Sequence, residues 1–334
     1  MSVRHVAGAS GPIATPYDAD IIILTIGRTD ETLAAIASAT EQTGVTAHVF
    51  VLDQGTEAHG LARLQCAMAS RPNVTLLAAQ DNLGVAGGRN VLSGLGHGRV
   101  IIGLDNDATF AAPDTAARLV RALDAEPRLA AIGCRILTGC GSADDLSSWG
   151  YPARLRPLAA ESFDAVTFVG AGHAIRRAAW AQVGGYDSAL FFCWEEYDFC
   201  LRAIALGWRV RYRGDIEIRH AVSPERRVCW TTARWFYFVR NRLYIERKQN
   251  PSLLPRLPRI CGYLLKGVHN GMARQTLRAI RAAANMPASS AAAMPAGPAQ
   301  VYIARNDRGH RGSLLRRCFT EVFARPGAAS AAGR

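Results

Sequence analysis

Two aspartates separated by one residue, Asp105 and Asp107, carry the strongest chemical signal in this chain, because they directly follow a short apolar run. The run at 100–104 is β-branched, which is typical of a buried strand. Side chains two residues apart on an extended backbone point the same way, so both carboxylates can converge beyond the strand end. Adjacent carboxylates repel each other unless a cation lies between them, and hard oxygen ligands favour Mg²⁺ or Mn²⁺. The alternative is a solvated turn with Asn106 at its tip.

Two segments nearer the N-terminus carry residues that can bind a nucleotide. Asp53 follows a predicted strand and precedes Gly55, so its carboxylate can bind a ribose or base edge; a plain turn is the alternative. Asn82 begins the glycine-rich segment 82–90, which precedes a predicted helix. Such loops can bring backbone N–H groups to a phosphate, although this one has neither the Walker nor the dinucleotide-binding order.

Three acids and one histidine in the second half are further candidates. Glu195, Glu196 and Asp198 lie at a predicted helix start, where the helix dipole alone favours acids. The alternative is that one of them is a general base, since the apolar run 191–194 can desolvate a carboxylate and raise its pKa. His220 ends a predicted strand, and a lone histidine is usually structural unless it joins the carboxylates as a third metal ligand.

Strands and helices alternate from Asp20 onward, which predicts a parallel sheet covered by helices on both faces. Ligands of such sheets bind beyond the carboxyl ends of the strands, where Asp53, Asn82 and Asp105 all fall. The predicted strands are 21–24, 45–52, 74–77, 100–104, 166–169, 208–212 and 216–218. The predicted helices are 31–41 (capped by Thr29 or Asp30), 57–69, 86–95, one opening at Pro113, 175–183, 195–206 and the basic aromatic stretch 226–248.

Composition divides the chain into four parts: a leader at 1–19, a main domain at 20–250, a basic helical extension at 251–286, and a linker and flexible tail at 287–334. The formal net charge of +12 is almost entirely arginine, which suits phosphate-bearing ligands, nucleic acid or an anionic membrane surface. The eight cysteines include no Cys-x-x-Cys pair and favour a reducing compartment. No signal peptide or membrane span is visible, so we expect a cytoplasmic protein with possible peripheral contact at the inner membrane face.

In this order, the segments resemble family 2 glycosyltransferases of the GT-A fold over about residues 20–247. The matching pieces are 22–25, 53–56, 82–84, 105–107, 184–187, the 195–198 acids followed by Arg202, and His220. Arg240-Asn241-Arg242 also resembles a motif of bacterial rhamnosyl- and galactofuranosyl-type members. The resemblance implies an α/β, GT-A (Rossmann-like), mixed and mainly parallel sheet flanked by helices, with a C-terminal helical extension.

The resemblance also implies roles. Thr25 and Asp53 would contact the base or ribose, and Asn82 would help hold the nucleotide. Asp105 and Asp107 would form the Asp-x-Asp site for Mg²⁺ or Mn²⁺, with Asp105 nearer the ribose or metal, and His220 would complete the metal sphere.

The catalytic base implied by the resemblance is Glu196, in an inverting single displacement. The family often has Glu-Asp where this chain has Glu195-Glu196, which leaves Glu195 and Asp198 as alternatives, although Asp198 also suits an i+4 pair with Arg202.

The function implied is transfer of a hexosyl or deoxyhexosyl group from a UDP- or dTDP-linked donor to a glycan or glycolipid hydroxyl, in bacterial cell-surface polysaccharide synthesis. One alternative is a nucleotidyltransferase that forms sugar nucleotides, for which residues 25–29 are a poor match to the required glycine-rich basic signature. Another is a non-enzymatic protein whose basic aromatic stretch binds nucleic acid or a membrane. Nucleic acid is not the partner expected.

Overall fold

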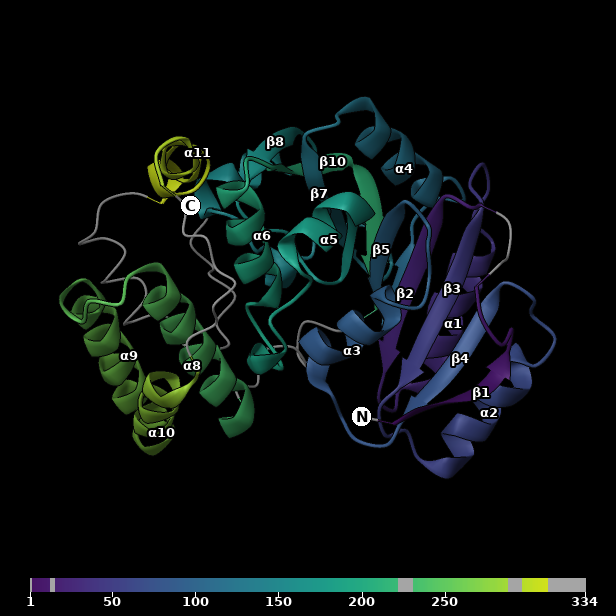
Figure 1. The fold of residues 1–334 in the computed structure, drawn as a ribbon, viewed down its shortest axis with the longest axis horizontal. Helices are drawn as coiled ribbons and strands as arrows, with labels where there is room; N and C mark the ends of the chain where they lie inside the picture. Colours follow the sequence, from purple (N-terminus) through teal and green to yellow (C-terminus); the bar gives the residue numbers. More distant parts are fainter. Residues whose placement is uncertain (1, 13–15, 222–230, 288–295, 312–334) are drawn as a thin grey trace.

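The computed structural model describes residues 2–12, 16–221, 231–287 and 296–311, built around one ten-stranded sheet (Figure 1). The strand order is β1-β4-β3-β2-β5-β9-β7-β10-β6, and β8 pairs with β10. The strands are β1 Val3–Gly8, β2 Ala19–Thr25, β3 Ala47–Asp53, β4 Val74–Ala79, β5 Val100–Asp105, β6 Ala108–Phe110, β7 Leu129–Thr138, β8 Ser162–Ala165, β9 Gly172–Arg176 and β10 Arg209–His220.

Helices cover both faces of this sheet. The helices are α1 Thr29–Thr40, α2 Ala58–Met68, α3 Gly84–Ser93, α4 Thr115–Ala125, α5 Arg177–Val183, α6 Glu195–Ala205, α8 Thr232–Gln249, α9 Leu257–His269, α10 Ala273–Asn285 and α11 Pro298–Asn306. Short 3-10 helices lie at Leu146–Ser148, Ala153–Leu158, Ser188–Leu190, Leu254–Arg256 and Arg308–His310.

Alternation along the central strands builds the two cores. Ile21 and Ile23 of β2 lie in the core cluster that also contains side chains of α1, α2 and α4. Ile22, between them, lies in the cluster with side chains of α3, α5 and α6. Both faces of the strand are therefore buried, which explains the unbroken apolar run.

The N-terminal half of the sheet is parallel from β4 through β3 and β2 to β5. The second half is mixed, since β9 runs antiparallel between β5 and β7, while β7 and β10 are parallel. Within β10 the pairing with β7 shifts between Arg213 and Glu217 and then resumes to His220. The antiparallel pair of β10 with β6 then sets His220 opposite Ala108, next to Asp107.

The sheet and its flanking helices confirm the α/β class and the mainly parallel central strands predicted from the sequence. Several predicted strand bounds and the predicted cap of one helix were wrong. Residues 166–169 form no strand, and β9 occupies 172–176 in their place. Residues 209–212 and 216–218 belong to the single strand β10, and residue 208 lies just before it. The residue capping α1 is Arg28, in a left-handed conformation, and not Thr29 or Asp30.

Both ends of the chain contribute more structure than composition predicts. The leader is not loose over residues 3–8, because β1 pairs antiparallel with β4. The tail contains α11, whose Ala299 and Ile303 are buried in the core cluster shared with α6. The Tyr302 hydroxyl lies 3.0 Å from the Ala165 carbonyl oxygen and 2.9 Å from that of Val210.

The basic extension at 251–286 contains α9 and α10, which gather with α8 at one end of the molecule (Figure 1). Trp235 and Val239 of α8, Tyr263 of α9 and Ala279 of α10 share a third apolar cluster. The start of the predicted 226–248 helix and most of the predicted tail lie outside the described residues. No helix among the described residues is long and apolar enough to cross a membrane.

Helix α11 should therefore contribute to the stability of the main domain. We expect Ile303→Ala to lower the free energy of unfolding by about 2–4 kcal/mol, because it leaves a cavity in the core. Val301→Ala on the same helix is the control: Val301 is 68% exposed, and its change should stay within about 0.5 kcal/mol. Chemical denaturation of the full chain measures both, and equal values would show that α11 is not part of the folded core.

Candidate active site

A cavity of about 890 Å³ opens at the carboxyl ends of β2 and β5. Its walls come from the segments after these strands, from residues 147–150 and 167–171, from the 191–197 segment that enters α6, and from the end of β10. The edge of the sheet that was predicted to bind a ligand therefore contains a cavity. This cavity lies between the parallel half and the mixed half of the sheet.

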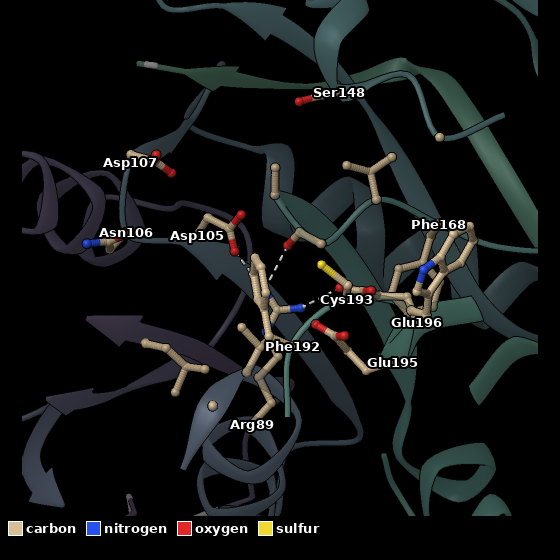
Figure 2. Close-up of a pocket in the computed structure, with 18 of the residues that line it drawn as sticks. Arg89, Asp105, Asn106, Asp107, Ser148, Phe168, Phe192, Cys193, Glu195 and Glu196 are labelled. Atoms are coloured by element: carbon tan, nitrogen blue, oxygen red, sulfur yellow. Dashed lines mark hydrogen bonds and ion pairs between the residues drawn. The ribbon is translucent and has the colours of Figure 1, made fainter. Parts of the chain in front are cut away.

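One wall of the cavity carries Asp105, Asp107 and His220. Each offers one ligand atom, and the three atoms lie within 4.8 Å of one another. In Figure 2, Asp105 and Asp107 point into the cavity while Asn106 points away. The Asn106 amide instead lies 3.2 Å from the Thr32 hydroxyl and 3.4 Å from that of Thr25. The convergence predicted for the two carboxylates is present.

The register of β10 with β6 brings His220 to this wall. A second carboxylate then contacts the ring nitrogen that faces away from Asp107. His220 Nε2 lies 3.0 Å from Asp107 Oδ1, and its Nδ1 lies 3.3 Å from Asp145 Oδ2. A carboxylate on one ring nitrogen holds the opposite nitrogen toward a metal, as is usual for histidine ligands. Two carboxylates and an imidazole in this arrangement fit Mn²⁺ or Mg²⁺. Asp107 also forms an ion pair with Arg28, which lines the cavity.

Arg89 of α3 connects this wall to the opposite one. Its guanidinium lies 2.8 Å from Asp105 Oδ1, 2.8 Å from the Gly170 carbonyl oxygen and 3.5 Å from Glu196 Oε1 (Figure 2). The side chain is 3% exposed. A buried guanidinium requires partners of opposite charge, and here the partners come from β5 and α6.

Glu195 and Glu196 begin α6 on the far wall. Burial raises the pKa of Glu195 well above its usual value, and the neighbouring Glu196 raises it further. Burial also raises the pKa of Glu196, but the Arg89 guanidinium opposes that shift. The Glu195 Oε2 atom has no hydrogen-bond partner among the described residues. Burial thus disfavours the charged form of both carboxyls, while the Arg89 guanidinium favours the charged form of Glu196, which it contacts.

The segment that leads into Glu195 has an unusual backbone. Phe191, Cys193 and Trp194 have φ of 62°, 71° and 74°. Side chains other than glycine seldom adopt this left-handed region, and several such residues together are costly unless other contacts hold them. The strained segment, residues 191–194, lines the cavity.

Helix α8 holds the strained segment from one side. The Asn241 side-chain nitrogen lies 2.8, 2.7 and 2.8 Å from the carbonyl oxygens of Leu190, Phe192 and Cys193. Asn241 is fully buried. Arg240 Nη2 lies 2.9 Å from the Leu190 carbonyl oxygen as well.

The N-terminus of α3 holds it from the other side. The Val85 N–H donates to the Phe191 carbonyl oxygen, with 2.6 Å between nitrogen and oxygen. Gly84 has φ of 69°, and a Cβ there would collide with Phe191. Asn82 Oδ1 accepts the Gly84 N–H at 2.8 Å. The glycine-rich segment thus uses backbone N–H groups to hold a neighbouring loop, a role that its pattern alone did not distinguish from phosphate binding.

The structure brings most of the predicted site residues to the cavity. Those that line it are Thr25, Asn82, Asp105, Asp107, Glu195, Glu196 and His220. Asp53 is not among the lining residues; its carboxylate accepts the N–H groups of Gly55 and Thr56 and so shapes the turn that carries Gln54. Asp198 is also away from the cavity. It lies 2.9 Å from Arg202 and 2.5 Å from Lys248, which confirms the i+4 pair.

Sequence reasoning missed Arg28, Gln54 and Arg89 at the cavity, and it gave Asn241 no structural role. Arg89 stands in the glycine-rich segment, where an arginine next to two glycines at a ligand-binding edge was an available signal. Nothing local to Asn241 indicates that it contacts residues 190–193, since some fifty positions separate them.

The fold and this site define a glycosyltransferase of the GT-A type. A family model described as glycosyl transferase family 2 matches residues 20–184. A search of curated proteins found no significant match.

Solved structures that share the fold include two with bound ligands. One is the mannosyltransferase PcManGT from Pyrobaculum calidifontis in complex with GDP-Man and Mn²⁺, with a TM-score of 0.54 and 17% identity over 95% of this chain and 86% of that one. The other is GalNAc-T7 with UDP, GalNAc and Mn²⁺, with a TM-score of 0.55 and 15% identity over 70% of this chain and 48% of that one.

Asn241 makes more side-chain contacts to the backbone at residues 190–193 than any other residue described above. We expect Asn241→Ala to lower the free energy of unfolding by about 2–4 kcal/mol, because buried carbonyl groups lose their donor. Amide hydrogen exchange in residues 191–194 should also become faster.

Asn285→Ala, at an exposed position ending α10, is the matched control and should change the unfolding free energy by less than about 0.5 kcal/mol. Chemical denaturation with exchange mass spectrometry measures both variants. Exchange in 191–194 that is unchanged in Asn241→Ala would show that this side chain does not hold the segment.

Proposed function

We propose that this glycosyltransferase moves a sugar from a nucleotide-sugar donor to a hydroxyl of a glycan or lipid-linked acceptor, with inversion at the anomeric carbon. The observation that carries the proposal is the cavity itself. It has three residues that could hold a cation on one wall and the largely buried carboxyl of Glu196 on the other, with Arg89 between them. Inverting transfer needs these two functions on opposite sides of one reacting carbon.

On the donor side, Asp105, Asp107 and His220 would hold Mg²⁺ or Mn²⁺. When bound, the ion supplies positive charge that stabilises the diphosphate leaving group. Thr25 and Asn82 line the adjoining part of the cavity and would contact the nucleotide, with Asp105 placed to share the ribose or the ion. Asp53 would act indirectly, through the turn that sets Gln54 in the cavity wall.

On the acceptor side, Glu196 would be the general base. Its carboxylate takes the proton of the acceptor hydroxyl as that oxygen forms a bond to the anomeric carbon and the bond to the diphosphate oxygen breaks. The side chain is largely buried, and the Arg89 guanidinium favours its ionised form before the proton is taken. Burial raises the pKa of Glu195 well above its usual value, which disfavours the ionised form that a general base needs.

The donor is proposed to be a UDP- or dTDP-linked hexose or deoxyhexose, in line with the resemblance to rhamnosyl- and galactofuranosyl-type enzymes. The acceptor is proposed to belong to a bacterial cell-surface polysaccharide. A protein acting on such precursors would work in the cytoplasm, at or near the inner face of the cell membrane.

Two substitutions separate the proposed roles. Glu196→Gln should keep donor and metal binding while turnover falls by about 10²–10⁴-fold, the usual contribution of a general base. Asp107→Ala should lose both turnover and the stabilisation that Mn²⁺ gives with a bound donor, because it removes a ligand and its charge.

Thermal shift across nucleotide sugars with Mn²⁺ or Mg²⁺, followed by a transfer assay with the donor found, measures both effects. Asp30→Asn, an exposed acid on α1, is the control for charge removal and should behave as wild type. Full transfer by Asp107→Ala without added divalent ion would exclude the metal role. Wild-type turnover by Glu196→Gln would exclude it as the base.

The burial of Glu196 also predicts a pH dependence. A general base works only when ionised, so kcat/KM should fall as the pH drops through the Glu196 pKa. Because burial raises that pKa, the fall should begin at higher pH than for an exposed glutamate. A pH–rate profile measures this, and the residual activity of Glu196→Gln should lack the same acid limb. An acid limb at the usual glutamate value in wild type would contradict the proposed environment.

A further inference from the structure

Each of the two aspartates that could hold a divalent ion already has an arginine as its partner. Asp105 Oδ1 lies 2.8 Å from Arg89 Nη2 (Figure 2), and Asp107 Oδ2 forms an ion pair with Arg28 Nη1. The other Asp107 oxygen, Oδ1, lies 3.0 Å from His220 Nε2. An ion that binds here therefore meets two carboxylates whose negative charge is already matched by positive charge within the protein.

The two arginines differ in their freedom to move. Arg89 is fixed, because its side chain is 3% exposed and also contacts the Gly170 carbonyl oxygen and Glu196. The Arg28 side chain is 47% exposed, and in the described part of the chain its guanidinium pairs with Asp107 alone. An ion pair with a half-exposed guanidinium costs little to break, since water can solvate the released charge. Arg28 is thus the arginine that can leave its aspartate.

Hydrogen bonds fix the backbone that carries Arg28. The Gly27 N–H donates to the Thr56 hydroxyl at 2.8 Å. The Arg28 carbonyl oxygen accepts the Thr32 N–H at 2.9 Å and the Thr32 hydroxyl at 2.8 Å. Release of the guanidinium therefore needs only rotation about side-chain bonds, with no rearrangement of β2 or α1. Because the side chain lines the cavity, the released charge stays near the ion.

We propose that Arg28 competes with the divalent ion for Asp107, so that the ion binds tightly only together with an anionic ligand such as a nucleoside diphosphate. An ion at Asp107 displaces the guanidinium or lies beside it, and either result costs free energy. A diphosphate adds negative charge that offsets both cations, so the ion and the diphosphate strengthen each other's binding. The proposal rests on the metal role that the proposed function gives to Asp105, Asp107 and His220.

The alternative is that Arg28 stays on Asp107 Oδ2 and orients this carboxylate while the ion uses Oδ1. Removal of an orienting partner weakens metal binding, whereas removal of a competitor strengthens it. A residue that orients a metal ligand is usually locked in place by further contacts. The Arg28 guanidinium has no hydrogen bond or ion pair beyond Asp107 within the described ranges, which favours competition.

Titration of the full chain with Mn²⁺, followed by the electron paramagnetic resonance signal of the free ion, tests the proposal. Arg28→Gln should bind Mn²⁺ alone about threefold to tenfold more tightly than wild type, because it removes the competing charge. Arg28→Lys keeps a positive charge at this position and should bind Mn²⁺ more weakly than Arg28→Gln.

The same titration in the presence of a saturating nucleoside diphosphate measures the coupling. The probe is whichever of UDP, dTDP and GDP raises the thermal unfolding temperature most with Mn²⁺ present. With this diphosphate bound, wild type and Arg28→Gln should bind Mn²⁺ with similar affinity. The gain in Mn²⁺ affinity that the diphosphate gives should therefore be larger in wild type, again by about threefold to tenfold.

Arg63→Gln is the matched control. The Arg63 side chain is 44% exposed and pairs with one acid, Asp30, away from the cavity. This variant should bind Mn²⁺ as wild type does, with and without the diphosphate. Thermal unfolding of every variant confirms that it is folded.

Equal or weaker binding of Mn²⁺ alone by Arg28→Gln would overturn the proposal, and weaker binding would give Arg28 the orienting role. A gain from the diphosphate that is no larger in wild type than in Arg28→Gln would overturn it as well. Asp107→Ala distinguishes these results from a failure of the metal site, because it should lose Mn²⁺ binding under both conditions. Mn²⁺ binding that is the same in wild type and Asp107→Ala would remove the metal role and this inference together.

Discussion

A single buried guanidinium organises the site. Arg89 has almost no access to solvent, and its partners Asp105 and Glu196 come from different secondary structure elements on opposite walls of the cavity. A charge in that position is stable only while its partners stay within reach, so the two walls are held at a fixed separation. The same contact opposes the rise in the pKa of Glu196 that burial causes. Cavity geometry and acid–base chemistry therefore depend on one side chain, which comes from the glycine-rich helix α3.

The strained segment before α6 shows how this arrangement is maintained. Three non-glycine residues in left-handed conformations would relax in an isolated peptide. Here α3 binds the segment through backbone N–H groups, and α8 binds it through Asn241. Both helices also line the cavity, through Val85 and Arg234 respectively. Elements that shape the site thus also fix the backbone from which the acids project.

The sequence predicted the parts of the fold that local patterns determine. Apolar β-branched runs marked β2 to β5, and residues at strand ends marked the cavity edge, because chain direction in a parallel sheet brings those ends together. Asp105, Asp107 and His220 were predicted together through the resemblance. Local patterns cannot show pairing between distant segments. In the sequence alone, the residues of β1 resemble a loose leader and those of α11 resemble a linker. Only the structure shows that β1 pairs with β4 and that two side chains of α11 are buried in the core.

The roles of Arg89 and Asn241 could not be predicted for the same reason, because both depend on contacts between segments that are far apart in the sequence. Arg89 meets Glu196 across a sequence separation of 107 residues. The resemblance marked Asn241 as part of a motif, yet only the folded chain shows which carbonyl groups it binds. Asp53 and Asp198 both have internal partners in the structure, and the pair of Asp198 with Arg202 is the one that the sequence spacing had favoured.

The register between β10 and β6 has a consequence for how this protein can change over evolutionary time. His220 reaches Asp107 only because it stands opposite Ala108, after the irregular pairing between Arg213 and Glu217 has realigned β10 with β7. A one-residue insertion or deletion between that point and His220 would turn the imidazole to the other face of the sheet. The loops that connect helices and strands between Asp107 and His220 can vary in length. The last few residues of β10 cannot gain or lose a residue without moving His220, so this short segment is the part of the chain between Asp107 and His220 that is most constrained in length.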